Sequence, residues 1–211
     1  MIRTNDKEYM RPKNLAKEEA IRSIALQIIS EEGLENLSMQ KLAKAANISP
    51  RTIYIKYENK EDLLVKLFIE EVLGTYEKAV LENFDPEMGF DEGMKRLWLN
   101  TFHYLKNNKP SFSLIQYGKS SPLLNNAFQA KNIRQGEFFA PIHVFLKTNI
   151  EAGLIPDLPH DVLRALLFSP IQDLVAEYFD HLDRPIQIIN EEMILTSCEI
   201  IIKGIIKSEK Q

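Results

Sequence analysis

The sequence predicts an all-α protein with about nine helices, because apolar residues recur at helical spacing and no segment alternates apolar with polar residues. Short segments rich in Asn, Asp, Gly and Pro separate the helical stretches, and such segments form turns. Apolar residues make up 45% of the 211 and charged residues 27%, which is the balance of an ordinary globular chain. We therefore expect a small N-terminal unit of three helices followed by a larger helical body.

The first helix is predicted over residues 14–32. Apolar side chains from Ile21 to Ile28 recur at i, i+3, i+4 and i+7, which places them on one face of a helix. Gly33 follows as the stop, because glycine readily adopts the conformation that ends a helix.

Two short helices are predicted next, over residues 38–46 and 49–56. Ser38 and Ser49 are placed as N-caps, whose hydroxyl groups accept hydrogen bonds from the free backbone N–H groups of the first turn. Asn47, in the turn between them, tolerates a left-handed conformation. Two capped helices joined by so tight a turn are typical of a helix-turn-helix.

A long fourth helix is predicted to begin after Asn59, with Asp62 reaching back to the helix start as in a capping box. Its buried face is predicted to hold four apolar residues, Leu63, Leu64, Leu67 and Phe68. Later turns are predicted where helix breakers gather, at residues 85–89, 107–110, 118–122, 153–159 and 183–185.

The third helix has an apolar side and a polar side. Ile53 and Tyr57, four positions apart, are expected to point inward. The residues left outside lie near a helix N-terminus, whose free N–H groups and dipole favour phosphate. Arg51 suits the edge of a guanine, and Pro50 or Ile55 suits the methyl group of a thymine. This side is therefore predicted to enter the major groove of DNA.

Polar side chains around the same helix suit phosphate groups, which position a protein on DNA without specifying sequence. The predicted DNA-binding residues are Ser38, Ser49, Pro50, Arg51, Thr52, Tyr54, Ile55, Lys56 and Lys60. Residues 1–60 carry 11 basic and 8 acidic side chains, whereas residues 61–211 carry 15 basic and 22 acidic ones, an asymmetry that favours a nucleic-acid-facing N-terminal end. The open alternative is a helical hairpin that merely packs.

Residues 16–68 resemble the DNA-binding domain of the TetR family of bacterial transcriptional regulators. The matching segments are Glu32-Gly33, Leu42 to Ala46, Ser49, Thr52-Ile53-Tyr54, Tyr57 and Asn59 to Leu64. The resemblance implies that four side chains hold the DNA backbone, those of Ser38, Thr52, Tyr54 and Lys60. It implies that Pro50, Arg51 and Ile55 lie near base edges. Three positions depart from the family's usual residues, namely Asn47, Lys56 and Tyr57.

The last two predicted helices, over residues 160–181 and 190–207, are apolar nearly all round. A helix of this kind is buried on more than one side, so we expect one side to face the core and the other to face a second copy of the chain. The resemblance implies the same homodimer, and a deeply buried monomer core is the alternative. We predict a DNA-binding domain over residues 1–58 and an effector-binding and dimerisation domain over residues 59–211.

The resemblance further implies a small-molecule pocket in the body, whose ligand moves the fourth helix and releases a repressor from its operator. Aromatic and polar side chains between residues 98 and 143 are the candidate lining, although each is also an ordinary core residue: Trp98, Phe102, His103, Tyr117, Phe138, Phe139 and His143. The expected effector is therefore small and largely apolar or amphipathic.

The sequence also bears on two other classes of protein. An enzyme is not expected, because no phosphate-binding glycine loop or nucleophile elbow appears, and no cofactor is expected. Asp173, Glu177 and His181 share one helical face but lack a second cluster to complete a metal site. A helical ligand-binding or adaptor protein with no DNA binding is the alternative function.

The single Cys198 and the lack of a long apolar run predict a cytoplasmic protein without a membrane span.

Overall fold

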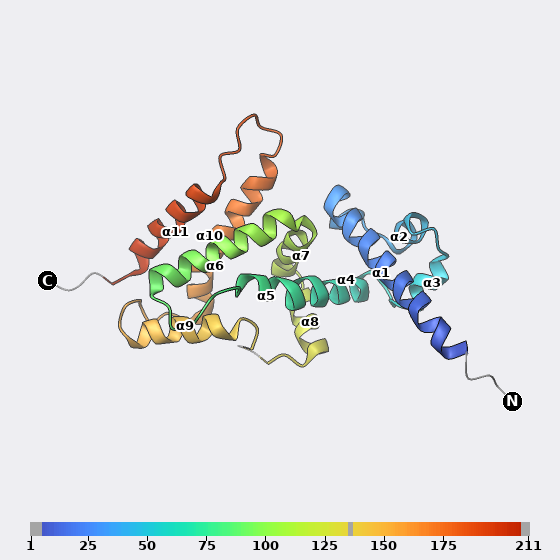
Figure 1. Cartoon of the computed structure of the whole chain (residues 1–211), viewed down its shortest axis with the longest axis horizontal. Helices are drawn as coiled ribbons and strands as arrows, with labels where there is room; N and C mark the ends of the chain where they lie inside the picture. Colours follow the sequence, from blue (N-terminus) through green and yellow to red (C-terminus); the bar gives the residue numbers. More distant parts are fainter. Residues whose placement is uncertain (1–5, 135–136, 208–211) are drawn as a thin grey trace. The chain divides into compact units, whose positions relative to one another are not determined.

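The computed structural model describes residues 6–134 and 137–207, and within them it contains helices and turns but no strand (Figure 1). The all-α prediction is confirmed. If α4, the π-helical segment and α5 are taken as one continuous helix, the described residues form ten helices rather than about nine. No helix in this part of the chain is both long enough and apolar enough to span a membrane.

By its internal packing the chain divides into two compact units. The first unit comprises Met1–Val72 with Lys109–Lys131, and the second comprises Leu73–Asn108 with Asn132–Gln211. This division follows packing, whereas the boundary predicted after residue 58 concerns function and stays a prediction. The chain therefore passes between the units three times, after Val72, after Asn108 and after Lys131.

In the described part of the first unit the chain forms six helices. They are α1 (Asp6–Glu32), α2 (Met39–Ala45), α3 (Pro50–Tyr54), α4 (Lys60–Phe68), α7 (Lys109–Ser120) and α8 (Leu123–Lys131). Helix α1 begins eight residues before the predicted start and ends at Glu32, after which Gly33 takes a φ of 91°. A 3-10 turn over Leu34–Asn36 leads into α2.

The fourth predicted helix consists of three consecutive segments, of which two are α-helical and the middle one is π-helical. Its α4 segment has Asn59 as N-cap, and the side chain of Asn59 accepts a hydrogen bond of 2.9 Å from the Asp62 N–H. The carboxylate of Asp62 reaches back, as predicted, but to the N–H of Glu58, at 3.0 Å. A π-helical segment over Ile69–Tyr76 and the short α5 over Glu77–Val80 follow. The sequence did not predict the π-helical segment.

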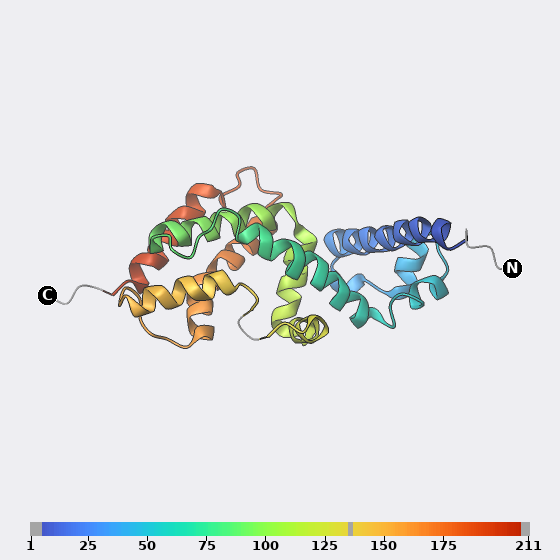
Figure 2. The ribbon, with the colours of Figure 1, turned by 60° about the horizontal axis from the view of Figure 1, so that its bottom comes forward.

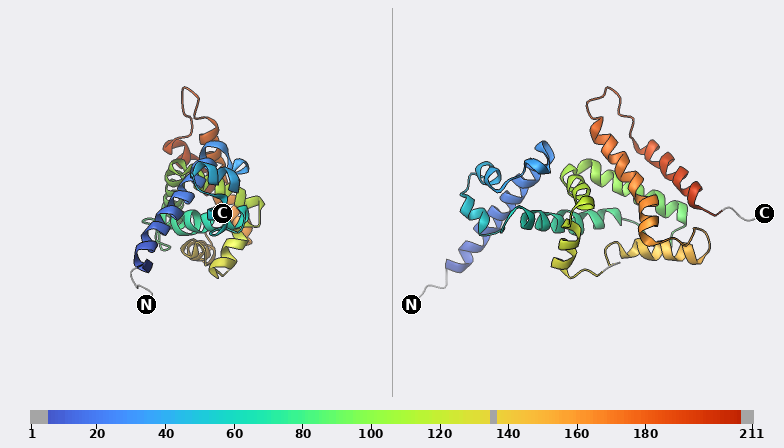
Figure 3. Two further views of the ribbon diagram at one scale, coloured as in Figure 1. Left: turned by 90° about the vertical axis from the view of Figure 1, so that its right-hand side faces the viewer. Right: turned by 180° about the vertical axis from the view of Figure 1, so that it is seen from behind.

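The second unit is organised around α6 (Phe90–Asn107), which packs against α5, α10 and α11 (Figure 2). The other helices are α9 (Ala140–Glu151), α10 (His160–Asp180) and α11 (Glu191–Ile205). Helices α10 and α11 are the two apolar helices that were predicted, and the turn between them runs over residues 181–190 (Figure 3). The predicted breaks omit the segment between α8 and α9, which contains no proline.

Candidate nucleic-acid interface

Helix α3 forms because its first turn is capped. The Ser49 hydroxyl accepts a hydrogen bond of 3.2 Å from the Thr52 N–H, and it lies 2.9 Å from the Thr52 hydroxyl. Pro50 occupies the first turn, where its missing N–H leaves no hydrogen bond unmade. Ile53 and Tyr57 are buried, as predicted, and anchor this short helix to the unit.

The opposite side of α3 is open to solvent. Tyr54 is 50% exposed and Ile55 73% exposed, while Pro50 and Arg51 are also exposed and Thr52 is half-buried. Ile55 lies four residues after Arg51 on the exposed side of this short segment, and both side chains suit contact with base edges. The structure thus brings these five predicted residues together around one short helix.

Helix α2 supplies the support for α3. The Ser38 side chain accepts a hydrogen bond of 3.2 Å from the Lys41 N–H, so the predicted cap is confirmed. Asn47 in the turn has a φ of 51°, the left-handed conformation that was predicted. The N–H of Ile48 then donates to the carbonyl of Ala43 at 3.0 Å, which closes the turn before α3 begins.

The predicted phosphate-binding lysines have partners within the first unit. Lys56 Nζ lies 2.7 Å from the Glu18 carboxylate on α1, and Lys60 Nζ donates to the Leu34 carbonyl at 2.9 Å. Lys66 Nζ donates to the backbone carbonyl of Lys56 at 2.9 Å. Sequence reasoning did not find Glu18, because no local pattern links positions 38 residues apart. The assignment of Lys56 and Lys60 to phosphate stays a prediction.

Burial raises the pKa of Tyr57 to about 12, and the charge of Glu18 adds to this effect. The Tyr57 hydroxyl therefore stays protonated in the neutral range. Lys66 Nζ lies 5.1 Å from the centre of the Tyr57 ring, so the ring also receives a cation–π contact. The end of α3 is held by packing and by charge together.

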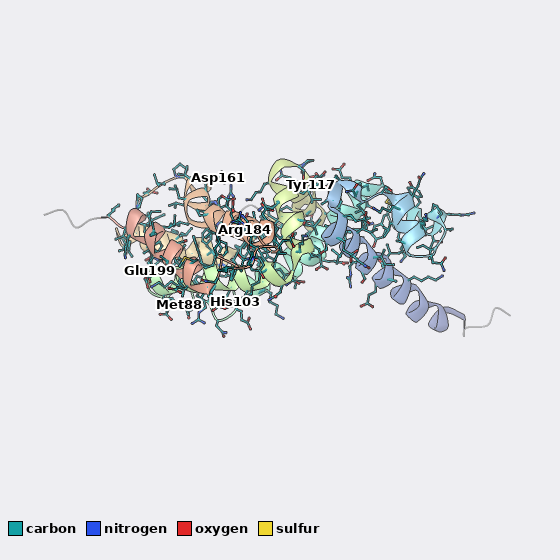
Figure 4. All side chains as sticks on the ribbon, turned by 90° about the horizontal axis from the view of Figure 1, so that it is seen from above. Met88, His103, Tyr117, Asp161, Arg184 and Glu199 are labelled. Atoms are coloured by element: carbon teal, nitrogen blue, oxygen red, sulfur yellow. The ribbon has the colours of Figure 1, made fainter. Side chains whose placement is uncertain are left out.

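The predicted effector residues do not all belong to one unit. Trp98 is buried in α6, and its indole N–H donates to the Leu167 carbonyl at 2.8 Å. Phe102 is buried with its ring edge-on to Tyr178, and His103 Nε2 lies 2.9 Å from the Glu191 carboxylate. Figure 4 labels His103 on α6 and Tyr117 on α7, and Tyr117 belongs to the first unit rather than the second.

Phe139 and the residues around it form a further group in the second unit. Phe139 precedes α9 with a φ of 58°, and its N–H donates to the Glu77 carboxylate at 2.6 Å. Its ring contacts Tyr76 edge-on and also touches Phe138, with centroid distances of 5.7 and 4.4 Å. Tyr76 and Glu77 were not predicted as site residues, because they lie in a helix whose pattern signals only packing.

His143, on α9, stacks on His160 at the start of α10, with ring centroids 4.2 Å apart. Burial lowers the pKa of His143, and the neighbouring His160 lowers it further. Within the second unit the candidate lining residues are connected. The His143 N–H donates to the Phe139 carbonyl at 3.2 Å, and Tyr76, whose ring contacts Phe139, also contacts Tyr104 on α6. Whether any of them touches a ligand stays a prediction.

The outer sides of α10 and α11 carry exposed apolar side chains. Leu166 is 47% exposed and Ile200 65% exposed, and Val162 and Met193 are exposed beside them on the same two helices. Other residues of the same helices, including Leu167 and Ile194, are fully buried. Each helix therefore has one side in the core of the second unit and one apolar side that the described residues of this unit leave exposed.

Two family models match the chain. Residues 21–67 match the model described as bacterial regulatory proteins, tetR family, and residues 90–199 match the tetracyclin repressor-like C-terminal domain. An uncharacterized HTH-type transcriptional regulator of Haemophilus influenzae is 30% identical over 159 residues, which cover 75% of this chain and 81% of that protein. The fatty acid metabolism regulator protein of Bacillus subtilis is 37% identical over 155 residues, 73% of this chain and 79% of the relative.

Solved structures show the same fold. A TetR family transcription regulator from Marinobacter aquaeolei VT8 has a TM-score of 0.73 and 24% identity, with 94% of this chain and all of that chain covered. The FadR regulator of Bacillus subtilis, solved in complex with stearoyl-CoA, has a TM-score of 0.67 and 20% identity, with coverages of 89% and 99%. The family comprises regulators rather than enzymes. With a capped α3 in its helix-turn-helix and both family models matched, the chain belongs to the TetR family of bacterial transcriptional regulators.

Proposed function

We propose that this regulator is a dimeric repressor that leaves its operator when it binds a long-chain fatty acid or the corresponding acyl-CoA. The repressor acts on DNA in the cytoplasm. The observation that supports DNA readout is the exposed side of α3, which presents Arg51, Tyr54 and Ile55 to solvent. The other side of this helix is fully buried.

The effector class rests on the relatives. The Bacillus subtilis relative at 37% identity is named for fatty acid metabolism, and a structural neighbour from that organism holds stearoyl-CoA. An acyl chain is apolar and needs apolar walls, which the aromatic residues of the second unit supply. We assign Phe139 as the residue that responds to the effector. Its backbone N–H donates a hydrogen bond to the Glu77 carboxylate near the end of the fourth helix.

The dimer rests on the uncovered apolar sides of α10 and α11. Two short reading helices on one twofold assembly bind two half-sites, which multiplies the few contacts that a single helix makes. The substitution Ile200→Glu places a charge on the proposed interface and is expected to give a monomer in light scattering. Val144→Glu is the matched control, because Val144 is 54% exposed but lies on α9. A dimer that survives Ile200→Glu would contradict this interface.

The experiment for DNA readout starts from duplexes selected out of a random pool by the full-length protein. Arg51→Ala is expected to relax the preference at one base position at a cost of about 1–3 kcal/mol, and Lys60→Ala to weaken binding to all duplexes alike. If neither variant differs from the parent, the assignment of α3 as the reading helix is wrong. A parent protein with no salt-dependent duplex binding would instead favour the adaptor function.

The effector experiment uses the same selected duplex and follows fluorescence anisotropy. Palmitoyl-CoA and palmitate are each expected to release the duplex, with free coenzyme A and a short-chain acyl-CoA as controls. Release by coenzyme A alone would show that the nucleotide rather than the acyl chain is recognised. Stable binding in the presence of every acyl compound would reject this effector class while leaving the DNA-binding role intact.

A further inference from the structure

The ion pair between Lys56 and Glu18 joins the end of the reading helix to α1. Lys56 Nζ lies 2.7 Å from Glu18 Oε2, and the two side chains are 30% and 45% exposed. We propose that Glu18 competes with the phosphates of DNA for Lys56 and thereby sets the affinity of this regulator for any duplex. This inference rests on the DNA-binding role and goes beyond it by naming an acidic residue that opposes binding.

Only the side chain of Lys56 is free to change its partner, because both backbone groups of this residue are hydrogen-bonded. Its backbone carbonyl accepts from Lys66 Nζ at 2.9 Å, and its backbone N–H donates to the Ile53 carbonyl at 2.8 Å. The next residue, Tyr57, is buried. A lysine has a flexible four-carbon stem, so the ammonium group can move from a carboxylate to a phosphate while the backbone stays in place.

The energies permit such an exchange. A partly exposed ion pair contributes little, about 0–1 kcal/mol, because water screens it and two long side chains must be held in place. A phosphate is an acceptor of the same kind for the same ammonium group, and each phosphate that a protein neutralises releases a counterion. Lys56 therefore has two acceptors of comparable strength, and removal of one shifts it to the other.

Arg51, within α3, provides the contrast to Lys56, which follows the end of this helix. The Arg51 side chain is exposed and forms no ion pair with another described residue, whereas Lys56 is paired with Glu18. The charge of Glu18 also acts on Tyr57, which follows the end of α3, because it contributes to the raised pKa of Tyr57. The competition is thus specific to the Lys56 end of the reading helix.

The test is a double-mutant cycle in the full-length protein with a long duplex of mixed sequence, because phosphate contacts do not depend on sequence. The parent, Glu18→Gln, Lys56→Gln and the double variant are titrated by anisotropy across a range of potassium chloride concentrations. Glu19→Gln is the matched control, since it removes the same charge from the next position of the same helix, where the side chain is also exposed. Thermal unfolding confirms that each variant is folded.

Glu18→Gln is expected to bind about threefold more tightly than the parent at moderate salt, in keeping with a weak exposed ion pair. The logarithm of the DNA-binding constant falls linearly with the logarithm of the salt concentration. The slope for Glu18→Gln is expected to be steeper than the slope for Lys56→Gln by about 0.9, and the slope for the parent is expected to lie between the two. In the Lys56→Gln background, the effect of Glu18→Gln is expected to shrink to that of Glu19→Gln.

Two results would overturn the proposal. Weaker binding by Glu18→Gln than by the parent would mean that Glu18 positions Lys56 for phosphate instead of competing with it. An equal gain in the presence and absence of Lys56 would mean that Glu18 repels DNA directly. A parent that binds no duplex at any salt concentration would reject the DNA-binding role itself, a failure distinct from both.

Discussion

The carboxylate of Glu77 accepts a hydrogen bond of 2.6 Å from the backbone N–H of Phe139, a residue held in the left-handed conformation with a φ of 58°. A bulky residue in this conformation is strained and persists only where its surroundings hold it, at a cost of about 1–3 kcal/mol. Glu77 and the rings of Tyr76 and Phe138 are among the contacts that hold it here. The start of α5 is thereby joined to the start of α9.

Replacing Glu77 by alanine is expected to lower the free energy of unfolding by about 1–3 kcal/mol, because the Phe139 N–H loses its charged acceptor. Glu77→Gln keeps an acceptor oxygen and is expected to lose less. Urea unfolding followed by circular dichroism measures both, with the exposed Glu82→Ala as control. If Glu77→Ala and Glu82→Ala unfold alike, the hydrogen bond does not stabilise the fold.

Ser49→Ala removes the N-cap of α3 and the hydrogen bond to the Thr52 hydroxyl. We expect a loss of about 1 kcal/mol in stability and weaker binding to every duplex, because the short helix frays without its cap. Ser49→Asn restores a capping oxygen and should recover the stability. Ser23→Ala, at an exposed position within α1, is the control in urea unfolding and duplex titration. A parental stability for Ser49→Ala would show that packing of Ile53 alone holds α3.

Gly93 is required by close packing. A Cβ at this position would lie 2.7 Å from Phe145 Cζ, and Phe145 is itself fixed between Phe90, stacked at 5.6 Å, and Phe84, edge-on at 5.3 Å. Gly93→Ala is therefore expected to cost about 1–3 kcal/mol in thermal or urea unfolding. Gly204→Ala, where a Cβ meets nothing within 4 Å, should not destabilise the fold. Equal stabilities of the two variants would contradict the packing argument.

The histidine pair gives a pH dependence of definite sign. Burial, with the help of His160, holds the pKa of His143 below its ordinary value of 6.5, so the unfolded chain binds a proton at a higher pH than the folded chain does. The contribution of His143 to the free energy of unfolding is fully present above about pH 6.5 and is lost as the pH falls below that value. His143→Asn is expected to make stability less dependent on pH between about pH 7 and 5 in urea unfolding. An unchanged pH dependence would mean that other groups account for it.

The local features of the DNA-binding part could be predicted from the sequence because caps and turns depend on neighbouring residues. Ser38, Asn47 and Ser49 all act as their residue types require, and Ile53 points inward as its spacing from Tyr57 demands. These are short-range effects, each set within about four residues along the chain.

The remaining features depend on contacts between distant parts of the chain. Nothing in the local pattern pairs Lys56 with Glu18 or directs Lys60 to the Leu34 carbonyl. For the same reason the sequence grouped Tyr117 with the residues of α6, although it lies in the other unit. Spacing shows which side of a helix is apolar, but only packing shows what that side meets.

The π-helical segment over Ile69–Tyr76 has a consequence for the evolution of the chain. A π-helix uses more residues for each turn than an α-helix does, so this stretch contains surplus length that an ideal rod would lack. A single-residue deletion between Phe68 and Glu77 can therefore be absorbed by conversion to ordinary α-helical hydrogen bonding. Homologous chains with a regular rod at this point should be one position shorter, a difference that an alignment of lengths would reveal.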